Sequence, residues 1–183
     1  MPARNQNEAD NNFAHYFRES LSVVTNAVVT AGREGDERVL LYEPPVKLQR
    51  KQGDPLFLSV TQTYRVKPHD GGFKATTTSY SYELSVKKDG LLEIIAAFHW
   101  HPAKTAKLKW PHVHIRGNTA EGDLGRKHFP TARISIEDFL RFLIRDFDVK
   151  PRPEYAVWKE ILTRNKREFV ANASWLDWKP LIS

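Results

Sequence analysis

The stretch FKATTTSYSYELSVKKDGLLEIIAAFHWHP, residues 73–102, decides the fold of this chain. It contains two runs rich in β-branched and aromatic residues, and the short segment KKDG between them is a hairpin turn signal. Two strands joined by so short a turn pair in antiparallel fashion. The stretch therefore predicts a β-hairpin whose second strand ends in the pair His99 and His101.

The hairpin extends on both sides into a meander. Residues 55–66, PLFLSVTQTYRV, predict a strand that turns at KPHDGG, and residues 110–117, WPHVHIRG, predict another after a lysine-bearing loop. Residues 38–45, RVLLYEPP, predict a short strand that the paired prolines stop, because proline lacks a backbone N–H. Four to five strands in this order favour an antiparallel β-meander over residues 39–116.

Helical patterns follow the strands. Ser135 and Asp138 form a capping box at the start of SIEDFLRFLIRDF, in which apolar residues recur at helical spacing: Ile136, Phe139, Leu140, Leu143, Ile144 and Phe147. A second helix is expected to begin at Pro153 and to carry Val157, Trp158, Ile161, Leu162, Phe169 and Val170. Strands first and helices afterwards predict an α+β fold with the helices packed on one face of the sheet.

The N-terminal part has a weaker pattern. Residues 1–12 are polar and predict a disordered lead-in. A helix to about Thr30 is predicted by the spacing of Phe13, Phe17, Leu21, Val24 and Val28, although the β-branched residues there also fit a strand. We expect a single α+β domain over residues 13–183, with C-terminal helices over residues 135–172, closed by Trp175 and Trp178.

The composition limits the possible chemistry. The 183 residues include 40% hydrophobic residues, as in globular proteins, and no cysteine, so only His, Asp and Glu are plausible metal ligands. The polar N-terminus lacks the apolar run of a signal peptide, and no stretch is long enough to span a membrane. We therefore expect a cytoplasmic protein without a membrane partner. The net charge of +6 favours an anionic partner.

Positive charge and histidine gather in one part of the chain. Residues 99–133 hold five of the seven histidines, with seven lysines and arginines against two acidic residues. Side chains two apart on a strand share a face, so His99 and His101 point to one side, and His112 and His114 do the same. The buried side of the first strand is then expected to carry Ile94, Ala96, Phe98 and Trp100. If the two strands pair, the four imidazoles share one patch, where mutual repulsion lowers some of their pKa values.

Three kinds of site would use these four histidines. In metal-free RNA cleavage, one histidine takes the 2′-hydroxyl proton, another protonates the leaving oxygen, and a cation stabilises the charged phosphorane. In a metal site, the same histidines bind a divalent ion such as zinc or manganese, and Tyr155 is a possible nucleophile. In a binding site without catalysis, the basic face holds RNA or an acidic protein, with Trp110 stacking on bases. The metal-free ribonuclease is the preferred hypothesis.

Candidate phosphate contacts lie close to the histidines in the sequence. The cations are Lys109, Arg116, Arg126 and Arg133. The segment RKHFPTARIS adds His128 and Thr131 just ahead of a predicted helix N-terminus, where free backbone N–H groups favour anions. An ordinary solvated loop ending in a helix cap would explain the same residues.

Several of these segments together resemble a known family. SYSYEL, DGLLEI, HWHP, WPHVHI and PTARISIEDFLRFLI, within residues 79–145, are similar to the TumE-type toxins of bacterial toxin–antitoxin pairs. The resemblance covers less than half of the chain, and the segment Pro111-His112-Val113-His114 carries it best. It implies an RNA-directed toxin or defence activity that an antitoxin partner restrains.

Overall fold

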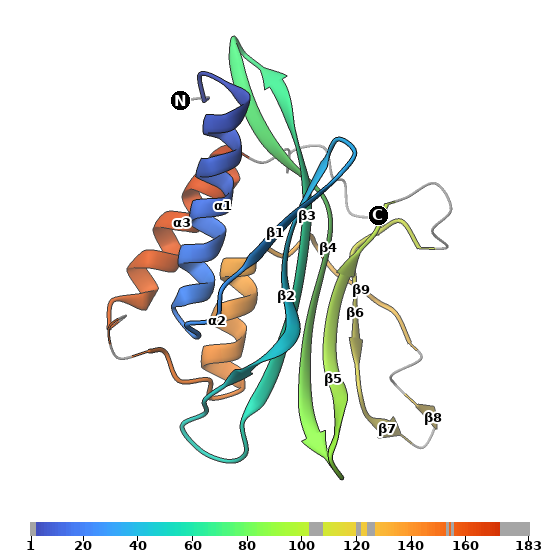
Figure 1. Cartoon of the computed structure of the whole chain (residues 1–183). Coiled ribbons are helices and arrows are strands. Elements are labelled where there is room, and N and C mark those ends of the chain that lie inside the picture. Colours follow the sequence, from blue (N-terminus) through green and yellow to red (C-terminus); the bar gives the residue numbers. More distant parts are fainter. Residues whose placement is uncertain are drawn as a thin grey trace.

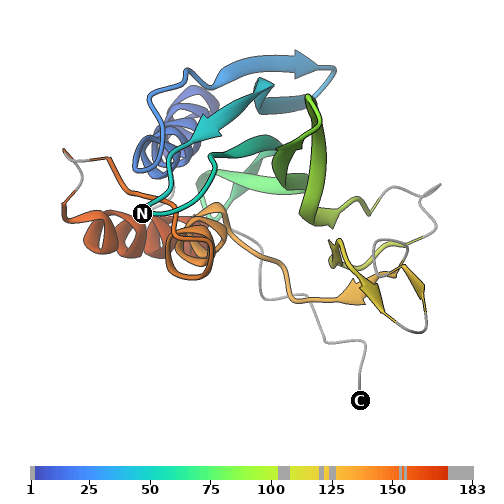
Figure 2. The same ribbon diagram turned by 90° about the horizontal axis from the view of Figure 1, so that it is seen from below.

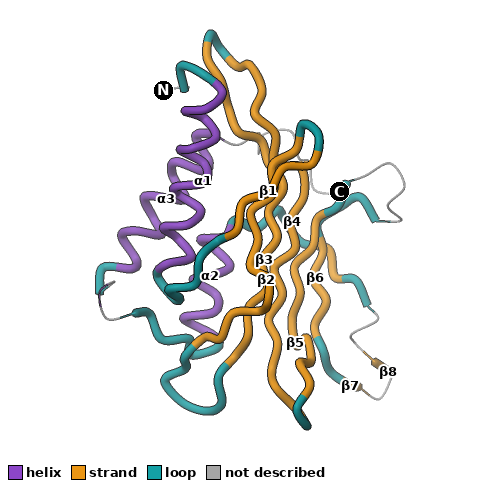
Figure 3. Tube along the Cα trace, in the orientation of Figure 1, coloured by secondary structure: helices purple, strands orange, loops and turns teal. Residues whose placement is uncertain are grey.

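The computed structural model describes residues 3–102, 108–119, 122–123, 127–152, 154 and 156–172. Within these ranges the chain forms an antiparallel sheet in the order β1-β2-β3-β4-β5-β6-β9, a separate pair β7-β8 and three helices (Figure 1 and Figure 3). The strands are β1 (Thr30–Glu34), β2 (Glu37–Leu48), β3 (Leu56–His69), β4 (Gly72–Lys88), β5 (Leu91–Trp100), β6 (His112–Ile115), β7 (Asn118–Thr119), β8 (Gly122–Asp123) and β9 (Phe129–Pro130). The helices are α1 (Gln6–Ser22), α2 (Ile136–Asp146) and α3 (Trp158–Asn172). The α+β class is confirmed, with more strands than the four to five expected.

The first helix lies earlier in the chain than the sequence predicts. It begins at Gln6 rather than Phe13, because the side chain of Asn5 accepts a hydrogen bond from the backbone N–H of Glu8 and caps the helix. The expected disordered lead-in is therefore wrong over residues 6–12. The helix ends at Ser22 rather than Thr30, and residues 23–29 bury valines in an irregular segment before β1.

The second strand passes through its paired prolines. The expectation that Pro44 and Pro45 end the strand is wrong, because β2 continues to Leu48. Its register against β3 shifts between the pairs Tyr42↔Val60 and Val46↔Leu58, so three residues of β2 face one residue of β3. A bulge leaves backbone groups out of the ladder, and the prolines there lack the N–H that the ladder would use.

A second register shift lies between β4 and β5. The pairs run from Lys88↔Leu91 to Ser85↔Ile94, and the next pair is Leu84↔Ala96, which leaves Ile95 as an extra residue. Side chains after this bulge face the side opposite to the one that regular pairing would give. Ile95 packs against the core, whereas Ile94 is 45% exposed, so the expectation that Ile94 lies on the buried side is wrong.

The helices cover one face of the sheet and form the core with it. In Figure 2 all three helices lie on one side of the curved sheet. Phe139 of α2 is fully buried, and its ring centroid lies 5.4 Å from that of Tyr82 on β4 and 5.5 Å from that of Phe98 on β5. Phe98, Trp100, Tyr80 and Tyr82 thus face the helices.

The prediction from the sequence is more accurate for α2 than for α3. The N-cap of α2 at Ser135 is confirmed, since the Ser135 hydroxyl accepts from the backbone N–H of Asp138; the same hydroxyl donates to the Asp138 carboxylate. The next helix begins at Trp158, five residues after the expected Pro153, and both Val157 and Val170 are exposed. No helix in the described ranges has the length and apolar character needed to cross a membrane.

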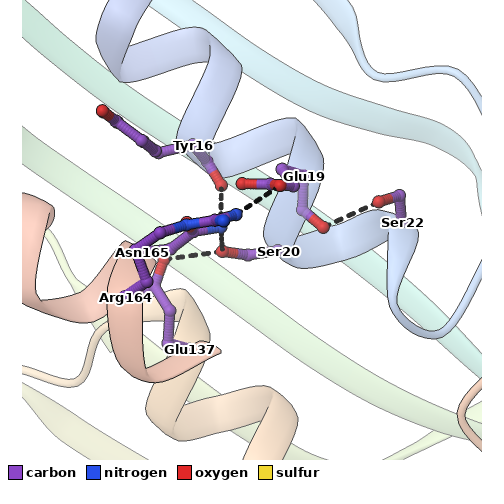
Figure 4. A network of polar contacts seen from close by, with 7 residues as sticks. All are labelled: Tyr16, Glu19, Ser20, Ser22, Glu137, Arg164 and Asn165. Atoms are coloured by element: carbon purple, nitrogen blue, oxygen red, sulfur yellow. Dashed lines mark hydrogen bonds and ion pairs between the residues drawn. The ribbon is translucent and has the colours of Figure 1, made fainter. Parts of the chain in front are cut away.

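A polar network joins the three helices (Figure 4). The Ser20 hydroxyl of α1 donates to Oε1 of Glu137 on α2 at 2.9 Å and accepts from the amide of Asn165 on α3 at 3.1 Å. The same amide donates to the carbonyl of Tyr16, and Arg164 pairs with Glu19 beside it. Ser20, Glu137 and Asn165 are buried, so this central part of the network joins the three helices away from solvent.

Candidate histidine site

Strands β5 and β6 place three histidines, His99, His112 and His114, on one face of the sheet, and His101 follows directly after β5. His99 lies directly opposite His112, and Ala97 lies opposite His114. Phe98 faces the helices, so its neighbour His99 faces the other way, and alternation along the strands extends this to His112 and His114. The predicted gathering of imidazoles on one side of the sheet is therefore present, on the face away from the helices.

The rings lie close enough to form one group. Ring centroids of His99 lie 5.6 Å from His101, 5.8 Å from His112 and 5.4 Å from His114. His128, just ahead of β9, joins them at 5.0 Å from His112 and 4.3 Å from His114. We call these five residues the histidine cluster.

Three members of the cluster form its centre. His99, His112 and His114 each offer a ring nitrogen, and these three atoms all lie within 4.8 Å of one another. His112 is buried, and the other two are half-buried. His101 and His128 are exposed, so they form a rim around a partly enclosed centre.

Hydrogen bonds fix the orientation of two central rings. His99 Nε2 lies 3.3 Å from Oε1 of Glu83 on β4, and the Ser81 hydroxyl donates to the same oxygen at 3.0 Å. His112 Nδ1 lies 3.0 Å from the carbonyl oxygen of Trp110. A carbonyl or carboxylate oxygen accepts the ring proton, which leaves Nδ1 of His99 and Nε2 of His112 as lone-pair donors.

The electrostatic environment favours the neutral form of two imidazoles, those of His112 and His101. Burial lowers the pKa of His112; the hydrogen bond to Trp110 opposes this, and the nearby histidines lower it further. Partial desolvation lowers the pKa of His101 although its side chain reaches the surface, and His99 adds to this. The hydrogen bond from His99 holds the pKa of Glu83 below its usual value. His101 and His112 therefore favour the neutral form, in which a ring nitrogen is basic, and Glu83 beside them favours the carboxylate.

Among the predicted cations that the structure describes, Arg116 and Arg133 each make a contact away from the histidine rings. Lys109 is exposed, and Arg116 forms a two-pronged ion pair with Glu93 at 2.7 and 3.2 Å. Arg133 stacks over Trp100, 3.7 Å from the ring centroid, and Trp100 lies on the helix side of the sheet. The guanidinium of Arg133 therefore lies on the helix side of the sheet, and its contact with phosphate stays a prediction.

Other predicted contacts lie at the edge of the cluster. The backbone N–H of Thr131 donates to the carbonyl of Pro111, which ties β9 to the start of β6. The Trp110 ring lies edge-on to His112, with centroids 5.4 Å apart. The following predicted residues lie outside the described ranges: Arg126, Pro153, Tyr155, Trp175 and Trp178.

Glu83 is the site residue that the sequence pattern does not reveal. Alternation along β4 places it on the face of Ser81, opposite the tyrosines. A regular hairpin closed at Lys88 and Leu91 would pair Glu83 with Ala96 and would pair His99 with Tyr80, so that His99 would face the helices, away from Glu83. The bulge at Ile95 pairs Glu83 with Ala97 instead, beside His99. The contact between Glu83 and His99 could be predicted only if the position of the bulge were known.

The fold and cluster together define an α+β protein with a partly enclosed histidine site. Comparisons with protein-family models, with curated proteins and with solved structures find no match to this chain. The similarity to TumE-type toxins therefore stays a prediction, and the chemistry of the cluster is the basis for a proposed function.

Proposed function

We propose that His99, His112 and His114 bind a divalent transition metal, zinc or manganese, and that the chain uses it to hydrolyse phosphodiester bonds in RNA. The observation that carries the proposal is the approach of three ring nitrogens to within 4.8 Å of one another. Zn–N bonds of about 2.0 to 2.1 Å in a tetrahedral site separate ligand nitrogens by about 3.3 to 3.4 Å. Small rotations of the three side chains would close the remaining gap.

The hydrogen bonds around the rings support a metal. Metal-binding histidines usually donate their second ring N–H to a carboxylate or a backbone carbonyl, which orients the ring and raises its basicity. His99 has Glu83 in this position, and His112 has the carbonyl of Trp110. Three protein ligands leave a coordination position for water, whose pKa falls to about 7 on zinc, so that hydroxide is available as a nucleophile.

The surroundings of the cluster support an anionic substrate. The metal would neutralise the phosphate and activate the attacking water, while His128 on the rim would protonate the leaving oxygen. The excess of lysine and arginine in residues 99–133 favours a polyanion, and Trp110 beside His112 offers a ring for base stacking. We propose RNA rather than DNA as the substrate because the resemblance to TumE-type toxins implies an RNA-directed activity.

Metal-free RNA cleavage is the second candidate, and the contact between His99 and Glu83 favours it. A carboxylate that accepts the Nε2 proton holds the imidazole in one tautomer and stabilises its charged form, as a general base requires. His99 would then take the 2′-hydroxyl proton, and a second histidine of the cluster would protonate the leaving oxygen. A toxin role with an antitoxin partner is compatible with both candidates.

One experiment separates the candidates. Purified protein is assayed for metal content and for cleavage of single-stranded RNA and DNA, before and after removal of metal with a chelator. We expect about one zinc or manganese per chain, and RNA cleavage that chelation abolishes and the metal restores. Cleavage that survives complete metal removal would establish the metal-free mechanism. RNA binding without cleavage under any metal condition would show that the chain is not a nuclease.

Glu83→Gln is expected to weaken metal binding by about 10- to 100-fold, the usual effect of losing a hydrogen-bond partner of a metal ligand. The amide keeps the size of the side chain but removes the charge that raises the basicity of His99. Metal affinity is measured by competition with a chromogenic chelator. The matched control is Glu93→Gln, which removes a carboxylate that pairs with Arg116, and it should leave the affinity unchanged. Equal affinities for both variants would contradict a role for Glu83.

A further inference from the structure

A second candidate site lies on the helix side of the sheet, and it is independent of the proposed function. A cavity of about 170 Å³ lies among α1, α2, α3 and the start of β4. Five aromatic rings line it: Phe13, Tyr16, Phe17, Phe73 and Phe169. An engineered apolar cavity of about 150 Å³ is large enough to hold benzene, so this one has room for a single ring with a small substituent.

One polar group in the wall of the cavity lacks a partner. Glu137 lines the cavity and is only 1% exposed. Its Oε1 accepts from the Ser20 hydroxyl, but its Oε2 is buried without a hydrogen-bond partner in the described part of the chain. A buried polar atom left unpaired costs about 1 to 3 kcal/mol, which a bound molecule with a complementary atom would recover.

The protonation of Glu137 determines which atom complements it. Burial raises the pKa of Glu137, the hydrogen bonds to its carboxyl group oppose this, and Asp138 raises it further. A raised pKa favours the protonated carboxyl group, which carries an O–H that donates a hydrogen bond. Its partner is then an acceptor such as a carbonyl oxygen, rather than an ammonium group.

We propose that this cavity binds a small neutral aromatic molecule that carries one hydrogen-bond acceptor. The ring lies among the five aromatic side chains, and the acceptor receives the proton of Glu137. Aromatic walls with a few polar groups, here Glu137 together with Asn12, Lys74 and Glu168, are the usual composition of a small-molecule site. The site lies on the face of the sheet opposite the histidine cluster, so its occupancy and the activity of the cluster can be measured separately.

Benzamide is the probe, because it combines one ring with a carbonyl acceptor, and toluene is the matched molecule without an acceptor. Binding to the full chain is measured by calorimetry and by the shift of the unfolding temperature. We expect benzamide to bind about tenfold more tightly than toluene, the value of one buried hydrogen bond. Benzylamine, a cation, is expected to bind more weakly than benzamide. Tighter binding of benzylamine would overturn the neutral-ligand assignment.

Variants of residues that line the cavity test separately the hydrogen bond from Glu137 and the space for the aromatic ring. Glu137→Gln keeps a neutral donor and is expected to retain the tenfold preference, whereas Glu137→Met keeps the size without a donor and is expected to lose it. Ala9→Leu places a larger side chain in the cavity wall and is expected to abolish binding of both probes even if Glu137→Met fails to fold. No binding by the wild type, or binding that Ala9→Leu leaves unchanged, overturns the proposal. The double variant His112→Ala, His114→Ala should bind benzamide normally.

Discussion

His112→Ala is expected to lower the rate of RNA cleavage by about 10²- to 10⁴-fold, the range for loss of a group that acts directly in proton transfer or metal binding. His112 is the most buried histidine of the central three and contacts rings from β5, β6 and the segment before β9. Its removal takes away one of three metal ligands or one acid–base group. The rate is measured with a labelled single-stranded RNA under single-turnover conditions.

The metal content of the same variant distinguishes the two mechanisms. If the cluster binds a metal, His112→Ala should purify with less than one ion per chain, and the loss of rate should follow the loss of metal. His69→Ala is the matched control, since His69 lies half-exposed at the far end of β3 beside Asp70. A His112→Ala protein with unchanged rate and metal content would show that the cluster is not the active site.

Phe139→Ala is expected to reduce the free energy of unfolding by about 3 to 5 kcal/mol, as large-to-small changes of buried aromatic residues do. The ring of Phe139 is fully buried and contacts Tyr82, Phe98 and Phe142, so its loss leaves a cavity between α2 and the sheet. The free energy is measured by urea unfolding followed by circular dichroism.

Phe129→Ala serves as the control for this change, because Phe129 is 39% exposed on the short strand β9. Its loss should cost about 1 kcal/mol or less. Since Phe98 and His99 are adjacent on β5, we also expect Phe139→Ala to reduce RNA cleavage before the protein unfolds globally. Equal destabilisation by the two changes would contradict the assignment of Phe139 to the core.

The sequence predicted those elements whose signals are local. The Ser135 cap and the apolar stripe behind it predicted α2 closely, because a cap and a face of a helix are both set by residues within one or two turns. The turn at Asp89 and Gly90 predicted the hairpin of β4 and β5. The start of α1 was missed because its cap, Asn5, lies in a polar segment that the apolar pattern does not reach.

The candidate site was predictable only in part. Alternation correctly placed His99, His101, His112 and His114 on one side of their strands, and pairing of β5 with β6 brought them together. The contact with Glu83 depended on an extra residue in β5, and Ile94 and Ile95 give no sequence signal for it because both are apolar. The position of Arg133 depended on stacking with Trp100 across the sheet, which no spacing in the chain specifies.

Because of the extra residue at Ile95, the number of residues in the first part of β5 determines which face of the sheet each later side chain takes. Every residue from Ala96 onward takes its side of the sheet from the number of residues that precede it. Gain or loss of one residue between Gly90 and Ala96 would exchange the aromatic side of the strand with its imidazole side, whereas a change of two would restore both. Natural variants that keep the same chemistry are thus expected to differ in length within this strand by even numbers only.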